Sequence, residues 1–260
     1  MTSWPAGVGR EILAETDSTN AEALRRAAAG GVGPEWICAL SQTAARGRRG
    51  RSWAMGAGNF AASLLMRPPA SNGVALAQRS FVAALGLHDA MVAVTGRPEL
   101  FALKWPNDVL LAGGKVAGIL LETGGPAGLP PALAIGIGVN LASAPEPGDL
   151  EPGAVPPASL RGATGIAVAP PDFLDLLAPA VDAWEERLAD EGFAPLRAAW
   201  LARASRIGEE VTARLPGRAL TGRFETIDPA GALVLATDDG RVVLPAAEIH
   251  FAEAGHAAGR

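Results

Sequence analysis

The change in hydrophobic period near residue 207 constrains the fold of this 260-residue chain more than any other feature. Before it, a long helical pattern such as 75–94 alternates with short apolar strand patterns. After it, every pattern is a short strand bounded by turn signals such as Asp238-Asp239-Gly240. We therefore expect a mixed α/β domain over residues 1–205 and a small β-barrel over residues 206–260.

The expected elements of both parts follow from these patterns. Thr19-Asn20-Ala21-Glu22 fits a capping box at a helix start, and Gly113-Gly114 predicts a two-residue hairpin turn. Residues 142–165 are rich in Pro and Gly and predict a long loop. The other patterns predict an extended entry over 10–17, helices over 75–94 and from Pro171, and strands over 36–40, 60–66, 101–105, 109–112, 115–122, 132–141, 210–215, 219–227, 231–236 and 241–244.

The composition excludes several classes of function. A net charge of −5 makes the chain a poor general binder of nucleic acid, so any anion site must be a local cluster of positive charge. Cys38 is the single cysteine and the three histidines lie far apart, which disfavours a disulfide and a histidine-built metal site. The chain shows no leader pattern and no apolar run of about 18 residues. We expect a cytoplasmic protein with no membrane and no nucleic-acid partner.

The sharpest local feature is the segment Arg46-Gly47-Arg48-Arg49-Gly50-Arg51, which places four guanidinium groups within six residues. Glycines let backbone N–H groups approach a ligand closely, and arginine forks match carboxylate or phosphate. The segment therefore predicts a loop that folds over a small anion. The alternative is a solvated basic loop, because runs of Arg and Gly are common.

Two further motifs place polar groups beside predicted strands. Lys104-Trp105-Pro106-Asn107-Asp108 is either a ligand site at a strand end or an ordinary turn. Lys115 follows the hairpin turn and enters an apolar strand, where it needs an anionic partner unless it extends to solvent. Gly118 in the same strand indicates a bulge or a close backbone approach.

The segment Ala134-Ile135-Gly136-Ile137-Gly138-Val139-Asn140 predicts a strand with two unlike faces. Ile135, Ile137 and Val139 share one face, whereas Gly136, Gly138 and Asn140 share the other. A face without side chains leaves room for another backbone or for a ligand. Asp17-Ser18-Thr19-Asn20 adds a helix N-terminus that offers N–H groups and hydroxyls, although capping alone explains Thr19.

Taken in order and spacing, these motifs resemble those of the biotin–protein ligase family. The resemblance covers about residues 10–205 and is carried by DSTN, Q-x-x-x-RGRRGR-x-W, KWPND, K-x-AGIL-x-E and IGIGVN, and the β-rich tail is similar to the family's C-terminal domain. It implies an α/β (α+β) catalytic domain, with helices flanking a mixed sheet, and a C-terminal SH3-like β-barrel. It leaves open whether the chain forms a homodimer.

The resemblance also implies a reaction and a set of contacts. The enzyme would join biotin to ATP as biotinyl-5′-AMP and transfer biotin to a lysine of a biotin carboxyl carrier protein. Lys115 and Arg48 would be catalytic, Lys104 and Asp108 would order the site, and Mg²⁺ would accompany ATP through ligands that the sequence does not indicate. Biotin would contact Ser18, Thr19, Asn20, Gln42, Arg46, Gly47, Arg48, Lys115 and Gly118, and ATP would contact Arg48, Arg51, Trp53, Asn107, Lys115 and Asn140.

Two departures and two alternatives remain. Ala45 stands where the family usually has Gly, which predicts a slightly different loop geometry. Sixteen residues precede Asp17, too few for a winged-helix DNA-binding domain, so we expect no repressor function. A lipoate or octanoate ligase or transferase of similar fold is one alternative, although a transferase would need Cys38, which lies in a buried strand pattern. A catalytically silent binding module is the other.

Overall fold

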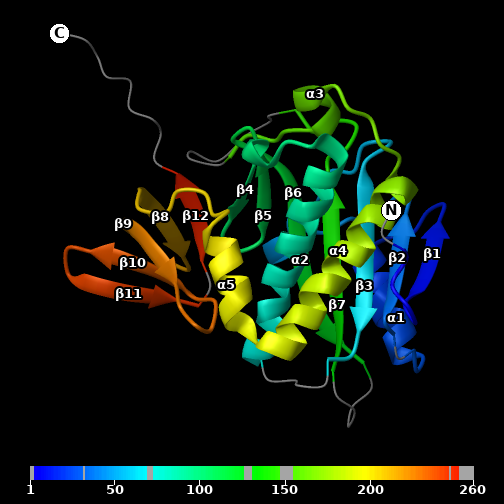
Figure 1. Ribbon diagram of the computed structural model, residues 1–260, viewed down its shortest axis with the longest axis horizontal. Helices are drawn as coiled ribbons and strands as arrows, with labels where there is room; N and C mark the ends of the chain where they lie inside the picture. Colours follow the sequence, from blue (N-terminus) through cyan, green and yellow to red (C-terminus); the bar gives the residue numbers. More distant parts are fainter. Residues whose placement is uncertain are drawn as a thin grey trace.

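The computed structural model describes residues 3–31, 33–68, 73–125, 131–146, 155–245 and 247–251. These residues form two β-sheets with helices packed mainly against the larger one (Figure 1). The larger sheet contains β1 (Gly9–Leu13), β2 (Glu35–Ala39), β3 (Phe60–Met66), β4 (Phe101–Lys104), β5 (Asp108–Leu111), β6 (Gly114–Gly124) and β7 (Ala132–Val139). The helices are α1 (Thr19–Ala28), α2 (Gly73–Thr95), α3 (Leu160–Thr164), α4 (Pro170–Glu191) and α5 (Phe193–Leu201), with short 3₁₀ turns at Arg48–Gly50 and Pro98–Leu100.

The larger sheet is mixed, as the family resemblance implies. Its order is β1-β2-β3-β7-β6-β5-β4, in which β1 and β2 are parallel and the other neighbours are antiparallel. The central strand β7 lies between β3 and β6, so the glycine-bearing IGIGVN segment crosses the middle of the sheet.

The two faces of the sheet are covered differently, and this difference positions the site. One face packs against α2 and α4 through the main hydrophobic core, which includes Ile135, Ile137 and Val139. The opposite face packs against α1 through a smaller cluster that includes Ala23, Ala27 and Ala134. The predicted division of the β7 side chains is therefore confirmed, and the glycines lie on the α1 side.

Two local predictions are corrected by the structure. Ser18, not Thr19, is the N-cap of α1, and its side chain accepts from Ala21 N. Glu22 does not fold back to complete a capping box, because its carboxylate accepts from Arg25 and Arg26 instead.

The hairpin turn after β5 occupies one position earlier than predicted. Ala112 and Gly113 both have positive φ, of 49° and 85°, and Leu111 pairs with Gly114. Positive φ at both central residues defines a type I′ turn, which matches the twist of the strands on either side. The glycine required by this turn is thus Gly113, and Gly114 already belongs to β6.

The smaller sheet contains β8 (Glu210–Leu215), β9 (Arg218–Ile227), β10 (Leu233–Thr237), β11 (Gly240–Leu244) and β12 (Glu248–Phe251). Its order is β11-β10-β9-β8-β12, and all neighbours are antiparallel. Among the described residues, β11 and β12 therefore lie at the edges of this sheet. The α/β fold with a C-terminal β unit is confirmed; β12 was not predicted, because it is a strand of four residues that contains both Glu248 and His250. Among the described residues, no helix combines the length and the apolar character needed to cross a membrane.

Candidate active site

A cavity of about 420 Å³ lies on the α1 side of β6 and β7, between that face and the arginine-rich segment. Almost all of the residues that the sequence singled out line it: Ser18, Thr19, Asn20, Gln42, Arg46, Gly47, Arg48, Arg51, Trp53, Asn107, Lys115 and Gly118. The motifs are far apart in the sequence, so their convergence on one cavity supports the prediction that they serve a common ligand site.

One end of the cavity is built from uncharged polar groups at the start of α1. The backbone N–H of Thr19 donates to Gln42 Oε1 at 2.7 Å. Ser63 Oγ, buried on β3, lies 2.6 Å from Asn20 Oδ1 and 2.8 Å from Thr19 Oγ1. An amide oxygen can only accept, so Ser63 donates to Asn20 and is free to accept from Thr19. These side chains are therefore fixed before any ligand arrives.

The bare glycine face of β7 is filled by two side chains. A Cβ at Gly136 would lie 2.4 Å from Asn20 Oδ1, and a Cβ at Gly138 would lie 2.9 Å from the Trp53 indole. Trp53 also approaches Gly118, which pairs with Gly138 across β6 and β7. The sequence had led us to expect another backbone or a ligand in this room, and the structure corrects that expectation, because two side chains lie there. The glycines instead allow Asn20 and Trp53 to lie against the sheet as the floor of the cavity.

The other end of the cavity carries positive charge from the arginine-rich segment. The segment folds back on itself, because Gly47 N donates to Arg51 O at 2.7 Å and Trp53 N donates to Ala45 O at 3.0 Å. Ala45 is not among the residues with positive φ, so alanine fits here without backbone strain.

Each cavity-lining arginine has an identified partner. Arg48 donates to Asn107 Oδ1 at 3.2 Å and to Ala247 O at 3.4 Å. Arg46 lies 3.6 Å from a Glu122 carboxylate oxygen, and Arg51 forms an ion pair with Glu248 on β12. The smaller sheet therefore contributes directly to the charged end of the cavity.

Lys115 enters the cavity because of a β-bulge. Leu110 pairs with Lys115 and Val109 pairs with Ala117, so Val116 is an extra residue on β6. The extra residue places Lys115 on the same face as Gly118, and its Nζ would lie 3.6 Å from a Cβ at that glycine. Strict alternation would have placed these two residues on opposite faces.

Asp108 anchors the two lysines of the site. Its carboxylate lies 2.8 Å from Lys115 Nζ and 3.8 Å from Lys104 Nζ. Lys104 is 8% exposed, and burial lowers its pKa, an effect that the nearby Asp108 carboxylate partly opposes. Lys115 is more exposed, with 32% of its side chain accessible, and is the lysine better placed to meet a substrate anion.

Asn140 is the one predicted site residue that does not line the cavity. It is 2% exposed, and its Nδ2 donates to Ala158 O at 3.1 Å. Its backbone also joins the chain on either side, since Asn140 N donates to Val116 O and Leu160 N donates to Asn140 O. In this structure Asn140 supports the segment around Ala158 beside the site.

Sequence reasoning missed four residues of the site. Ser63 lies in an apolar strand pattern, and Glu122 was quoted in a motif but given no role, although it accepts from Asn20 Nδ2 at 2.8 Å. Glu248 and His250 come from β12 and reach the cavity only through the packing of the smaller sheet. A polar residue at an inward position of an apolar strand was the available signal for Ser63 alone.

Two side-chain classes bear on the chemistry that the site can support. In the part of the chain that the structure describes, no three His, Cys, Asp or Glu side chains gather as a metal site. Cys38 lies on the α2 and α4 side of the sheet, away from the cavity, and burial raises the pKa of its thiol to about 12. A protonated thiol on the wrong face of the sheet is not a nucleophile for this cavity.

Two protein-family models match parts of this chain. Residues 16–140 match the model of the Biotin/lipoate A/B protein ligase family, and residues 207–251 match that of the Biotin protein ligase C terminal domain. A biotin–[acetyl-CoA-carboxylase] ligase of Paracoccus denitrificans is 56% identical over 240 residues, covering 92% of this chain and 99% of that protein. One from Mycobacterium tuberculosis is 34% identical over 245 residues, covering 92% and 87%.

A solved structure supports the same assignment. The biotin protein ligase from Aquifex aeolicus in complex with biotin and ATP superposes with a TM-score of 0.77 and 26% identity, covering 93% of this chain and 97% of that one. This chain belongs to the biotin–protein ligase family.

Proposed function

We propose that this protein is a biotin–protein ligase, which activates biotin with ATP and transfers it to a lysine of a biotin carboxyl carrier protein of acetyl-CoA carboxylase or a related carboxylase. The observation that carries the proposal is the unequal charge along one cavity. Its α1 end offers hydrogen-bonded neutral groups, whereas the rest of its wall carries five cationic side chains in a chain of net charge −5: Arg46, Arg48, Arg51, Lys104 and Lys115.

The uncharged end suits the ring system of biotin. Ser18, Thr19, Asn20 and Gln42 offer hydroxyl and amide groups that are already held in place, and Trp53 and the glycine strip provide an apolar floor. Polar groups that are held in position before binding orient a small ligand in a pocket at low entropic cost. Biotin would lie with its valerate chain directed along the cavity towards Arg48 and Lys115.

The cationic end suits the first step of the reaction. A biotin carboxylate oxygen attacks the α-phosphorus of ATP, the bond from that phosphorus to the bridging oxygen breaks, and pyrophosphate leaves. The two reactants are both anions, so the step requires positive charge between them. Lys115 and Arg48 would neutralise the carboxylate and the developing charge on the α-phosphate, while Asp108 keeps Lys115 in place. Arg51, Trp53 and Asn107 would lie nearer to ATP.

Mg²⁺ fits this site as a companion of ATP. Asp108 and Glu248 are carboxylates of the cavity wall, and both are ion-paired with cations of the chain. A magnesium ion would therefore be held mainly by phosphate oxygens and water, and it would supply further neutralisation of phosphate charge.

The second step needs no covalent enzyme intermediate. The carrier lysine, as a free amine, attacks the carbonyl carbon of biotinyl-5′-AMP, the bond to the phosphate oxygen breaks, and AMP and a proton are released. Water would hydrolyse the same mixed anhydride, so the arginine-rich segment that covers the cavity would protect it.

We further propose that the boundary between the catalytic and the C-terminal unit lies at residues 205 and 206.

A lipoyl or octanoyl transferase is the competing function, and one observation weighs against it. The sole cysteine, Cys38, is buried on the opposite face of the sheet. A lipoate or octanoate ligase needs no cysteine and is separated from a biotin ligase by its acid substrate.

The test is biotin-dependent exchange of labelled pyrophosphate into ATP in the absence of any carrier protein. We expect exchange with biotin and none without an added acid. Exchange with lipoate or octanoate, and not with biotin, would overturn the proposal. Subsequent addition of a carrier domain and its Lys→Arg variant checks the transfer step, because only the lysine form should become biotinylated.

A further inference from the structure

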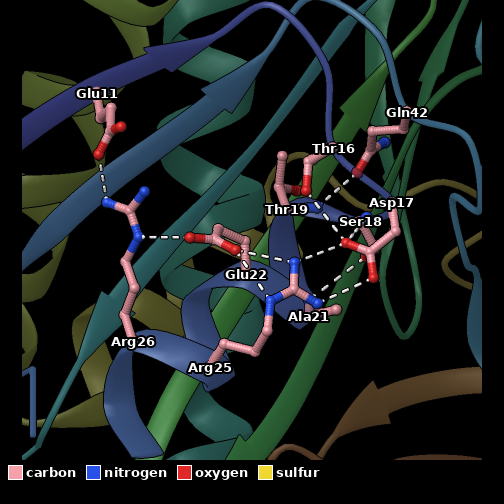
Figure 2. Close-up of polar contacts among 10 residues, drawn as sticks. All are labelled: Glu11, Thr16, Asp17, Ser18, Thr19, Ala21, Glu22, Arg25, Arg26 and Gln42. Atoms are coloured by element: carbon pink, nitrogen blue, oxygen red, sulfur yellow. Dashed lines mark hydrogen bonds and ion pairs between the residues drawn. The ribbon is translucent and has the colours of Figure 1, made fainter. Parts of the chain in front are cut away.

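The turn that leads into α1 is held from outside the cavity by Asp17 (Figure 2). Asp17 Oδ1 accepts from Ser18 N at 2.7 Å and from Thr16 Oγ1 at 3.1 Å. The Asp17 carbonyl oxygen accepts from Ala44 N at 2.8 Å, which joins the turn to the segment after β2. Asp17 does not itself line the cavity, but its three contacts fix the backbone immediately before Ser18.

Asp17 is in turn held by Arg25, from the second turn of α1. Arg25 Nη2 donates to Asp17 Oδ1 at 2.7 Å and Nη1 donates to Oδ2 at 2.9 Å, a bidentate arrangement (Figure 2). Glu22 steadies the guanidinium, since it accepts from Arg25 Nε at 3.0 Å. The Arg25 hydrogen bonds hold the pKa of Asp17 well below its usual range, so the carboxylate is charged at neutral pH.

The adjacent Arg26 makes an equally charged network that leads elsewhere. Arg26 contacts Glu11 on β1, Glu35 on β2 and Glu22 on its own helix, and among the described residues Asp17 is not one of its partners. Arg26 therefore ties α1 to the sheet, whereas Arg25 ties α1 to the turn that begins the site. The two neighbours form a natural pair of test and control.

We propose that Arg25 is a positioning residue: by clamping Asp17 it presets the turn that carries Ser18, Thr19 and Asn20, and so sets the affinity for biotin without touching it. The inference rests on the proposed function, because it assumes that biotin occupies the α1 end of the cavity. Arg25 is too far along the helix to be found by the motif, which ends at Asn20.

The physical basis is preorganisation. The side chains of Asp17 and Arg25 are about half exposed, so the pair itself adds only modest stability in water. The pair instead raises the fraction of molecules whose turn is already in the binding geometry. When that fraction falls, the apparent affinity for biotin falls in the same proportion. The cationic end of the cavity is untouched, so the rate of adenylation at saturating biotin should not change.

The experiment compares Arg25→Gln with Arg26→Gln in the full chain. Biotin affinity is measured by calorimetry, and KM for biotin, KM for ATP and kcat come from pyrophosphate exchange. For R25Q we expect biotin Kd and KM to rise roughly fivefold, equivalent to about 1 kcal/mol, with kcat and KM for ATP within about twofold of wild type. For R26Q we expect a lower Tm and an unchanged biotin Kd.

Two additional variants sharpen the result. Arg25→Lys should recover part of the affinity, because lysine keeps the charge but cannot make the two-pronged contact. Asp17→Asn combined with R25Q should be no worse than D17N alone if the two side chains act as one unit. High salt should bring wild type towards R25Q, because the pair is exposed.

The outcomes distinguish this inference from the proposed function. If wild type binds biotin and R25Q binds it equally well, the positioning role is wrong and the function stands. If R25Q and R26Q weaken biotin binding equally, Arg25 acts through general stability and the role is also wrong. If wild type neither binds biotin nor catalyses exchange, the proposed function itself fails.

Discussion

The two ends of the cavity are built by opposite means. At the α1 end, uncharged groups satisfy one another through buried partners, as Ser63 does for Asn20 and Thr19. At the arginine-rich end, Arg46 and Arg51 are about half exposed, with 48% and 56% of their side chains accessible, and they are paired with carboxylates from β6 and β12. A neutral ring is recognised by groups fixed in advance, whereas an anion is recognised by cations whose present partners can be exchanged for it.

The carboxylates at the charged end thus have a role of their own. Without them, several guanidinium and ammonium groups would face one another in a partly enclosed cavity, which is unfavourable. Glu122, Asp108 and Glu248 offset that repulsion. Substrate phosphates and the biotin carboxylate would replace some of these contacts, so the net gain on binding is smaller than the charges alone suggest.

The largest expected effect comes from breaking the charged end at Lys115. We expect Lys115→Ala to reduce biotin adenylation about a hundredfold, since one positioned charge at a developing negative centre contributes about 3 kcal/mol. Arg187→Ala, which removes an exposed pair with Glu191 far from the cavity, is the control and should retain activity. A folded K115A enzyme within about threefold of wild type would reduce Lys115 to a surface lysine.

An intermediate effect is expected from removing the Ser63 hydroxyl, which holds the α1 end of the cavity in place. In Ser63→Ala, the buried Asn20 Oδ1 loses its donor, and we expect biotin to bind roughly tenfold more weakly, with a lower Tm, because an unsatisfied buried acceptor costs about 1–3 kcal/mol. Ser41→Ala, which removes an exposed contact with Glu15, should do neither. Unaltered biotin affinity in S63A would mean that Asn20 is held sufficiently by Leu120 and Glu122.

The smallest expected effect comes from Glu248, and it tests whether ATP phosphates replace this carboxylate as the partner of Arg51. We expect Glu248→Gln to lower KM for ATP about twofold at low salt, because the triphosphate no longer has to displace a carboxylate from the half-exposed Arg51. The difference should vanish at high salt. A rise in KM for ATP would show that Glu248 orients Arg51 instead of competing for it.

The sequence predicted most of the elements, though not β12 or the short helix α3 inside the expected loop over 142–165, and it predicted most of the cavity, because both depend on local patterns. Period-two alternation assigned the β7 faces correctly, and each motif reached the cavity from its own strand end or turn. Contacts between distant segments were not accessible in this way. Nothing near Arg51 indicates Glu248, and nothing in the glycine strip indicates that Trp53, more than eighty residues earlier, lies on Gly138.

Irregular geometry was the other source of error. Alternation counted from Gly118 would place Lys115 on the core side, so its position in the cavity could not be derived without knowing of the bulge. The turn after β5 was misplaced by one residue because two adjacent glycines compete for the role, and the structure uses Ala112 and Gly113. The capping box failed because Glu22 had two arginines within reach.

Because of the bulge at Val116, the number of residues in one short hairpin decides whether Lys115 faces the cavity or the core. Surface hairpins usually tolerate a residue gained or lost between related proteins. Here, removing Gly114, the residue just before Lys115, would restore regular pairing with β5 and exchange the places of the Lys115 ammonium group and the Val116 isopropyl group. The charge would then face the hydrophobic core beneath α2, and the valine would face the substrates. A relative that loses the residue before this lysine would therefore have to carry its lysine one position nearer to Gly118, so that the ammonium group stays in the cavity.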